Sequence, residues 1–266
     1  MGIFAADCLA GKHVLITGAT GGIGWEAAKT TAQMGASITI TGRNLAKLKQ
    51  LETELLDIID SSRLYVHAAE ITEQKDREML VESAQQKLGF IYGLVNSAGA
   101  AGGKPVEELD QEFVERLMNI NYTSTLLLTQ LVYQDMREKR QGTIVNLASL
   151  SGLRGTAGNT AYAASKFAVV GWTQSMALEA IEYGVRVNAV CPGYVDTEMA
   201  RASIRRKADN QGISYGQALE QATASIPSKR LSTPQEVANT IAYLLTDAAQ
   251  NIVGESVKIS GGSVMR

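Results

Sequence analysis

Short apolar runs alternate along the chain with segments of helical periodicity. The apolar runs are almost continuous, as expected for strands that are buried on both faces of a sheet. They cover residues 13–17, 37–41, 64–68, 93–96, 143–147, 185–190 and 256–259. The helical patterns cover residues 23–34, 45–59, 73–87, 111–139, 162–182 and 234–245. This alternation predicts βαβ units with right-handed crossovers, and hence an α/β fold with a doubly wound parallel sheet of about seven strands and helices on both faces.

The alternation runs through nearly the whole chain without a repeat, a linker or a low-complexity tract. We therefore expect a single domain over residues 1–266. One stretch, residues 194–230, is mostly polar and helical and contains no predicted strand. Connections of this length inside a compact domain are often lids or binding loops. We therefore interpret residues 194–230, called the 194–230 insert below, as a mobile substrate lid.

Composition removes several classes of function. The chain has 266 residues, of which 45% are hydrophobic and 20% charged, and its formal net charge is −2, so a nucleic-acid partner is not expected. Its two cysteines and two histidines predict neither a disulfide framework nor a metal site. No signal peptide or membrane-spanning run is predicted, so we expect a cytoplasmic protein that does not bind membranes.

A glycine-rich turn follows the first predicted strand and opens the first helix. Its sequence is Thr17-Gly18-Ala19-Thr20-Gly21-Gly22-Ile23-Gly24. Glycines there permit a tight turn and the close approach of a pyrophosphate, which the free N–H groups at the helix N-terminus can bind. We expect a dinucleotide to bind here, against Gly18, Thr20, Gly22, Ile23 and Gly24.

Two further groups of residues point to acid–base chemistry. Tyr162 and Lys166 are four residues apart in a predicted helix, so their side chains share one face. A nearby ammonium stabilises a phenolate, which makes a tyrosine a better acid or base at neutral pH. Ser149 follows the fifth strand and is expected at the carboxyl edge of the sheet, where open α/β sheets bind ligands.

The glycine spacing, Gly18-x-x-x-Gly22-x-Gly24, resembles that of the short-chain dehydrogenase/reductase family, and other motifs extend the resemblance over roughly residues 10–263. The segment Asn96-Ser97-Ala98-Gly99 is similar to the family's Asn-Asn-Ala-Gly motif, with a serine in place of the second asparagine. Asn121 matches the family's catalytic asparagine, and the segment that begins at Pro192 resembles the one beside the nicotinamide.

The resemblance implies a Rossmann-type fold and a specific mechanism. A hydride passes from the dinucleotide to a carbonyl carbon, Tyr162 protonates the developing alkoxide, and Ser149 hydrogen-bonds and orients the carbonyl oxygen. Lys166 holds the nicotinamide ribose and lowers the pKa of Tyr162, while Asn121 positions a water that relays protons to Lys166. The implied catalytic residues are Asn121, Ser149, Tyr162 and Lys166.

The residues after the second strand indicate which dinucleotide is used. Gly42 stands where family members that prefer NAD usually carry an acidic residue, and Arg43 follows it; a guanidinium there suits the 2′-phosphate of NADP. A solvated arginine at a helix start is the alternative. Asn44 is close enough to share the phosphate, and Glu70-Ile71 stands where the family commonly has Asp-Val near the adenine. The remaining expected cofactor-binding residues are Asn96, Ala98, Gly99, Tyr162, Lys166, Pro192, Gly193, Val195 and Thr197.

The leading hypothesis is an NADPH-dependent ketoreductase. Its expected substrate is a small carbonyl compound, a 3-oxoacyl thioester carried by CoA or a carrier protein or a related ketone, because two segments, residues 191–194 and 230–238, resemble those of such reductases. A dehydrogenase of sugars or small alcohols is the alternative. A non-enzymatic dinucleotide sensor is a third class, which the intact catalytic set argues against. The family resemblance also implies a homotetramer.

Overall fold

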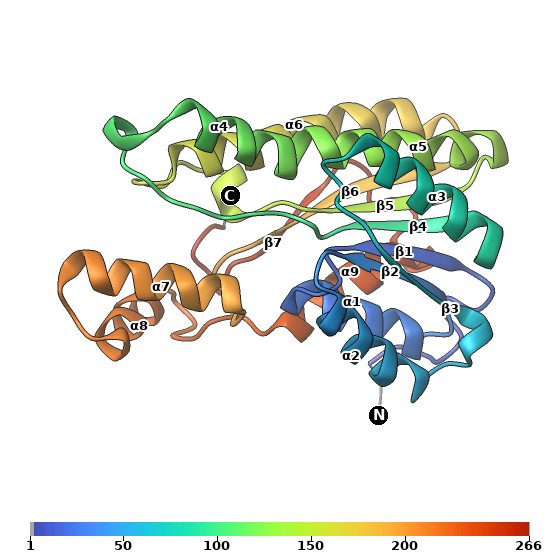
Figure 1. Cartoon of the computed structure of the whole chain (residues 1–266), viewed down its shortest axis with the longest axis horizontal. Helices are drawn as coiled ribbons and strands as arrows, with labels where there is room; N and C mark the ends of the chain where they lie inside the picture. Colours follow the sequence, from blue (N-terminus) through green and yellow to red (C-terminus); the bar gives the residue numbers. More distant parts are fainter. Residues whose placement is uncertain (1–2, 266) are drawn as a thin grey trace.

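The computed structural model describes residues 3–265, and its centre is a seven-stranded sheet in the order β3-β2-β1-β4-β5-β6-β7, with every neighbouring pair parallel (Figure 1). The strands are β1 (His13–Thr17), β2 (Ser37–Gly42), β3 (Leu64–Ala68), β4 (Ile91–Asn96), β5 (Gly142–Leu147), β6 (Val185–Pro192) and β7 (Ser256–Ile259). The predicted strands agree with these within two residues at each end. The predicted fold class, a Rossmann-type doubly wound sheet, is confirmed.

Helices cover both faces of the sheet (Figure 1). One layer contains α1 (Gly22–Gln33), α2 (Leu45–Leu56) and α9 (Pro234–Leu245). The opposite layer contains α3 (Gln74–Leu88), α4 (Gln111–Met118), α5 (Ser124–Lys139) and α6 (Thr160–Ile181). Successive side chains of a strand point to opposite faces, so Val14 and Ile16 pack in the first layer and Leu15 packs in the second. This division explains why the strands are apolar without alternation.

The prediction of one helix over residues 111–139 is wrong. Two α-helices, α4 and α5, are joined by one turn of π-helix at Asn119–Thr123, which contains Asn121. The Asn121 side chain bonds to the backbone of Ala100 and to Ser165, both remote in sequence. The wider turn lets Asn121 make these tertiary contacts, which local periodicity cannot reveal.

The 194–230 insert is helical, as predicted, and contains α7 (Glu198–Gln211) and α8 (Tyr215–Ala224). The two helices pack through a small apolar cluster of their own, formed by Ile204, Ala208, Ala218 and Ala222. Figure 1 shows the pair at the left, set apart from α1, α2 and α9. The insert's mobility stays a prediction.

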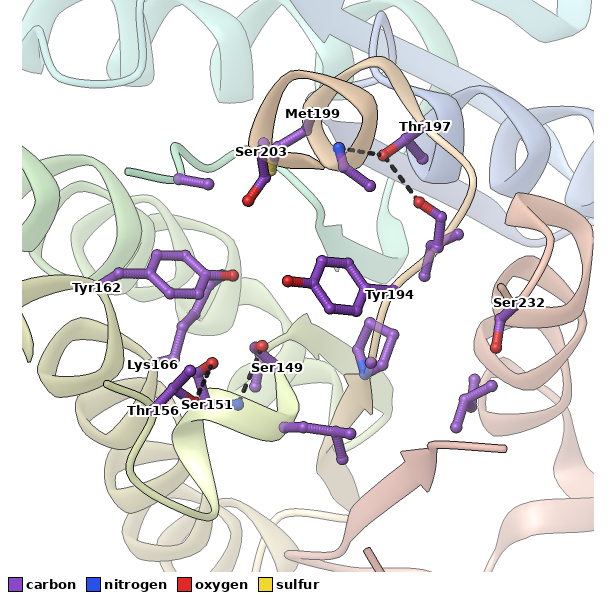
Figure 2. Close-up of a pocket in the computed structure, with 18 of the residues that line it drawn as sticks. Ser149, Ser151, Thr156, Tyr162, Lys166, Tyr194, Thr197, Met199, Ser203 and Ser232 are labelled. Carbon is purple, nitrogen blue, oxygen red and sulfur yellow. Dashed lines mark hydrogen bonds between the residues drawn. The ribbon is translucent and has the colours of Figure 1, made fainter. Parts of the chain in front are cut away.

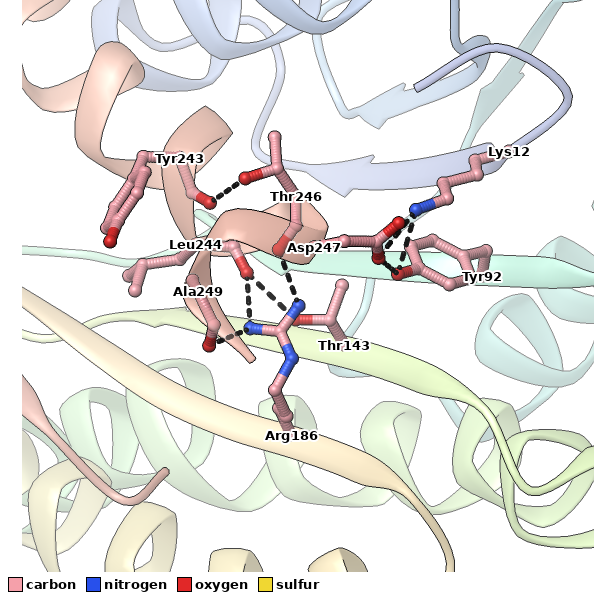
Figure 3. Close-up of polar contacts among 9 residues, drawn as sticks. All are labelled: Lys12, Tyr92, Thr143, Arg186, Tyr243, Leu244, Thr246, Asp247 and Ala249. Carbon is pink, nitrogen blue, oxygen red and sulfur yellow. Dashed lines mark hydrogen bonds and ion pairs between the residues drawn. The ribbon is translucent and has the colours of Figure 1, made fainter. Parts of the chain in front are cut away.

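A buried arginine ties β6 to the end of α9 (Figure 3). Arg186 is 7% exposed and donates hydrogen bonds to the carbonyls of Leu244 (2.8 Å), Thr246 (3.0 Å) and Ala249 (3.1 Å). These carbonyls include the last unpaired acceptors of α9, where a cation is favoured by the helix dipole. The guanidinium therefore holds the end of α9 against the sheet.

Candidate active site

The predicted site residues gather at one edge of the sheet, because the carboxyl ends of parallel strands meet there. The glycine turn follows β1, Arg43 and Asn44 follow β2, and Glu70-Ile71 follows β3. The segment Asn96–Gly99 includes and follows the end of β4, Ser149 follows β5, and Pro192 ends β6. Six separate stretches of sequence are thus brought to one rim.

The glycine turn is tightly built. Gly18 has φ +61°, and a Cβ on it would lie 2.6 Å from the backbone of Ala98, while a Cβ on Gly24 would lie 2.5 Å from the Gly18 carbonyl oxygen. Gly21, which precedes α1, offers no side-chain cap, and the first turn of α1 carries no acidic residue. The N-terminal N–H groups of α1 are therefore available to an anion, which fits the predicted pyrophosphate site.

Two buried side chains, Thr17 and Asn96, hold the segment after β4 in place. The Thr17 hydroxyl accepts hydrogen bonds from the backbone N–H groups of Ser97 and Ala98, each at 3.1 Å. The Asn96 side chain turns into the core, where its Nδ2 donates to Thr129 (2.8 Å) and to Asn146 (2.9 Å). Any contact of Asn96 with a cofactor would therefore come from its backbone.

Arg43, the predicted 2′-phosphate ligand, is paired with Glu70. The guanidinium lies 3.2 Å from the carboxylate, with 68% of the Arg43 side chain and 34% of the Glu70 side chain exposed. Asn44 caps α2 by accepting from the Lys47 N–H at 3.0 Å, which leaves its NH₂ free to donate. Gly42 faces Thr20, since a Cβ on it would lie 3.0 Å from the threonine side chain.

A cavity of about 440 Å³ opens beside this rim. It is lined by three of the predicted catalytic residues, Ser149, Tyr162 and Lys166. Figure 2 shows their side chains together, with the Tyr162 hydroxyl facing the cavity. The predicted cofactor-binding residues Ile23, Gly99, Pro192, Gly193, Val195 and Thr197 also line it. The acid–base group and part of the predicted dinucleotide site therefore share one space.

Burial controls the protonation of both residues on α6. Burial raises the pKa of Tyr162, and its hydrogen bond with Ser149 opposes that rise in part. Burial lowers the pKa of Lys166 to about 8. The lowering of the Tyr162 pKa by Lys166 that the resemblance implies stays a prediction; the ammonium lies 6.0 Å from the centre of the Tyr162 ring and donates to the Leu147 carbonyl at 2.8 Å. Tyr162 is therefore set up as a protonated acid at neutral pH.

Asn121 lies behind the cavity wall and is 2% exposed. Its Nδ2 donates to the Ala100 carbonyl and to Ser165 Oγ, both at 2.9 Å, and its Oδ1 accepts from the Ala100 N–H at 2.8 Å. Gly99 separates it from Lys166, since a Cβ on Gly99 would lie 3.0 Å from Asn121 Oδ1 and 3.6 Å from Lys166 Nζ. The asparagine thus fixes the loop above Lys166, and its role in a water relay stays a prediction.

Several residues that line the cavity were not predicted from the sequence. Tyr194 is the most prominent, and Figure 2 shows its hydroxyl facing that of Tyr162. Its position directly after Pro192-Gly193 was the available signal. Ser151, Arg154, Thr156, Met199 and Ser203 also line the cavity, but they come from loops and from α7, whose placement local sequence does not determine.

Within residues 3–265, no helix has the length and apolar character needed to cross a membrane. The same residues contain no group of three or more His, Cys, Asp or Glu side chains that could hold a metal ion.

Comparison with known proteins identifies the family. The sequence profile of the short chain dehydrogenases matches residues 12–208. The chain therefore belongs to the short chain dehydrogenase family, which is a family of oxidoreductases.

Individual relatives and solved structures show which members of the family the chain resembles. The chain is 33% identical to the 3-oxoacyl-acyl-carrier-protein reductase of Vibrio cholerae, over 97% of this chain and 99% of that protein. It is also 33% identical to the D-beta-hydroxybutyrate dehydrogenase of Cupriavidus necator, over 96% of this chain and 99% of that protein. The crystal structure of an actinorhodin polyketide ketoreductase with NADPH superimposes with a TM-score of 0.91 at 32% identity, covering 95% of this chain and 97% of that one. The predicted resemblance to ketoreductases is confirmed.

Proposed function

We propose that the protein reduces a ketone to a secondary alcohol with NADPH. The observation that carries this proposal is the meeting of Ser149, Tyr162 and Lys166 in one cavity, beside a glycine turn whose helix N-terminus is open to a phosphate. The relatives named above support it, because two of them are named as ketone reductases and one of those was crystallised with NADPH.

Each residue has its own role in the proposed reduction. NADPH, when bound, supplies a hydride to the carbonyl carbon. The Tyr162 hydroxyl donates a proton to the oxygen as negative charge develops there, and its raised pKa keeps it protonated at neutral pH. The Ser149 hydroxyl donates a hydrogen bond to the same oxygen, since Ser149 lines the cavity within hydrogen-bond reach of Tyr162. Lys166 lies beneath them and binds the nicotinamide ribose.

The proposed cofactor-binding residues lie along the carboxyl edge of the sheet. The open N-terminus of α1 takes the pyrophosphate, and Arg43 takes the 2′-phosphate once it exchanges its partner Glu70 for the phosphate. Thr197 lies close to Gly22, because a Cβ on that glycine would lie 3.0 Å from the threonine methyl group. The two sides of the dinucleotide site are therefore near each other before a ligand binds.

A second candidate is the reverse reaction, oxidation of a hydroxy acid. The relationship to a D-beta-hydroxybutyrate dehydrogenase favours it, and the same residues would serve it with Tyr162 as the base. The raised pKa of Tyr162 favours reduction near neutral pH, where an acid is needed.

The test is Tyr162→Phe, which removes the hydroxyl and keeps the ring. We expect cofactor binding, followed by the fluorescence of NADPH, to stay within about twofold, while the rate of NADPH oxidation with a 3-oxo substrate falls by roughly 10²-fold or more. Near-normal turnover in the variant would refute the assignment of Tyr162 and reopen the possibility of a non-enzymatic sensor.

A further inference from the structure

The charges that line the cavity are all of one sign. Its lining includes Arg154, Lys166, Arg206 and Arg230, and among the residues of the described chain that line it there is no Asp or Glu. The other polar lining residues are mainly serines, threonines and an asparagine, which carry no charge. A cavity built for a neutral ketone needs no excess of cations.

Two of the four cations are already neutralised or committed. Arg230 forms a two-pronged pair with Glu236, with nitrogen–oxygen distances of 2.6 and 2.9 Å. Lys166 is buried and donates to the Leu147 carbonyl. Neither is free to bind a further anion directly.

Arg154 and Arg206 are different. Both are exposed, and within residues 3–265 neither guanidinium has a hydrogen-bond or ion-pair partner. Asp196 pairs with Arg201 at 2.8 Å and Glu198 pairs with Lys47 at 2.6 Å, while Asp209, three residues after Arg206, forms no ion pair with it. The two arginines are therefore uncompensated positive charges at the cavity.

The dinucleotide does not account for them. Its predicted phosphate sites are the N-terminus of α1 and Arg43, both on the side of β1 and β2. Arg206 is eight residues into α7, which places it about 12 Å along that helix from Glu198. Arg154 comes from the loop between β5 and α6, on the side of Ser149 and Tyr162. Both arginines thus line the cavity from segments other than those that carry the predicted phosphate sites.

We infer that Arg154 and Arg206 bind an anionic oxygen group of the substrate, so that the preferred ketone carries a carboxylate or a phosphate. This inference rests on the proposed function and names its substrate class. A guanidinium binds either group through paired N–H donors. The anion is either the carboxylate of a free 3-oxo acid or the phosphate on the pantetheine arm of a thioester.

Two pairs of substrates separate the charge from the reacting carbonyl. Acetoacetate is compared with methyl acetoacetate, which has the same ketone without the charge. Acetoacetyl-CoA is compared with acetoacetyl-N-acetylcysteamine, which keeps the thioester and lacks the phosphates. We expect the charged member of at least one pair to have a kcat/KM about tenfold or more above its neutral partner, at the low end of the range for charge-assisted hydrogen bonds because both arginines are exposed. The pair that shows the preference identifies the source of the anion.

Arg154→Gln and Arg206→Gln test the residues, and Arg205→Gln is the matched control. Arg205 is the neighbour of Arg206 on α7, but it does not line the cavity and its guanidinium lies 5.7 Å from the Tyr215 ring. We expect the two test variants to lose most of the preference for the charged substrate, and the control to keep it. The KM for NADPH should stay within about twofold in all three. Added salt should reduce the preference in the wild type, since exposed charges are screened.

The outcomes are distinguishable. Equal use of charged and neutral ketones, or a preference that survives in both test variants, would overturn the inference and leave the proposed function standing. If no ketone is reduced, the proposed function fails. Calorimetric binding of acetoacetate and of CoA to the wild type and to Arg206→Gln then decides the inference separately: tighter binding of either one by the wild type supports it, and equal or absent binding of both overturns it.

Discussion

Lys166 offers the sharpest test of how burial shapes the site, through the variant Lys166→Met. Methionine has a similar length and carries no charge. Burial lowers the pKa of Lys166 from its usual 10.5 to about 8, so the charged form is less stable in the folded protein than in the unfolded chain. Each tenfold loss of proton affinity corresponds to about 1.4 kcal/mol, so the buried ammonium destabilises the fold by roughly 3 kcal/mol when it is charged.

The sign of the pH dependence follows from the direction of the shift. The folded pKa is the lower one, so the unfolded state binds more protons between about pH 8 and 10.5. The destabilisation is therefore complete below pH 8 and is relieved as the pH rises toward 10.5. Methionine also leaves the Leu147 carbonyl without its partner, which costs about 1–3 kcal/mol at every pH. Only the contribution of the charge varies with pH.

Urea unfolding of both proteins at pH 7, 8, 9 and 10 measures this difference. We expect the stability of Lys166→Met relative to the wild type to fall by roughly 2 kcal/mol between pH 7 and 10. Lys207→Met, at an exposed position on α7, is the control and should show no such trend. If the difference between Lys166→Met and the wild type is the same at pH 7 and pH 10, the ammonium is not destabilised by burial and the reasoning is wrong.

Four further predictions concern the cofactor, the frame, the assembly and the insert. Arg43→Ala should lower kcat/KM for NADPH about tenfold with NADH use nearly unchanged, whereas Glu70→Gln should raise NADPH use; equal loss with both cofactors in the first variant would contradict the 2′-phosphate role. Arg186→Met should lower the free energy of unfolding by about 3 kcal/mol or more in urea, because three carbonyls lose a buried donor, and an unchanged midpoint would refute this. Light scattering should give a homotetramer at micromolar concentration, and a monomer would contradict the family expectation. Hydrogen exchange should be fast in residues 194–230 and slower with cofactor and substrate, so slow exchange in both states would argue against a lid.

The sequence predicted the sheet well because its signals are local. Apolar runs, helix periodicity and the glycine turn each depend on neighbours a few residues apart, and the strands agree with the structure within two residues. The order of motifs then indicated which residues would share an edge. The resulting expectation that Ser149, Tyr162 and Lys166 converge is seen in the cavity.

What the sequence did not predict depends on contacts between remote segments. The π-helical turn around Asn121 exists beside bonds to Ala100 and Ser165, which are 21 and 44 residues away. The raised pKa of Tyr162 is caused by burial in the surrounding fold, which the spacing to Lys166 does not reveal. The pairing of Arg43 with Glu70 joins the ends of two strands. None of these contacts produces a periodic pattern in the sequence.

The small apolar cluster within the 194–230 insert has a consequence for how this scaffold diversifies. Because α7 and α8 bury Ile204, Ala208, Ala218 and Ala222 against each other, the pair relies little on the sheet for its own packing. Substitutions on its cavity side, such as at Met199 or Arg206, can change what is recognised while the strands that carry the acid–base group keep their register. Exchange of α7 and α8 alone between relatives should therefore transfer substrate preference, while Val195 and Thr197, which precede α7, stay with the cofactor site.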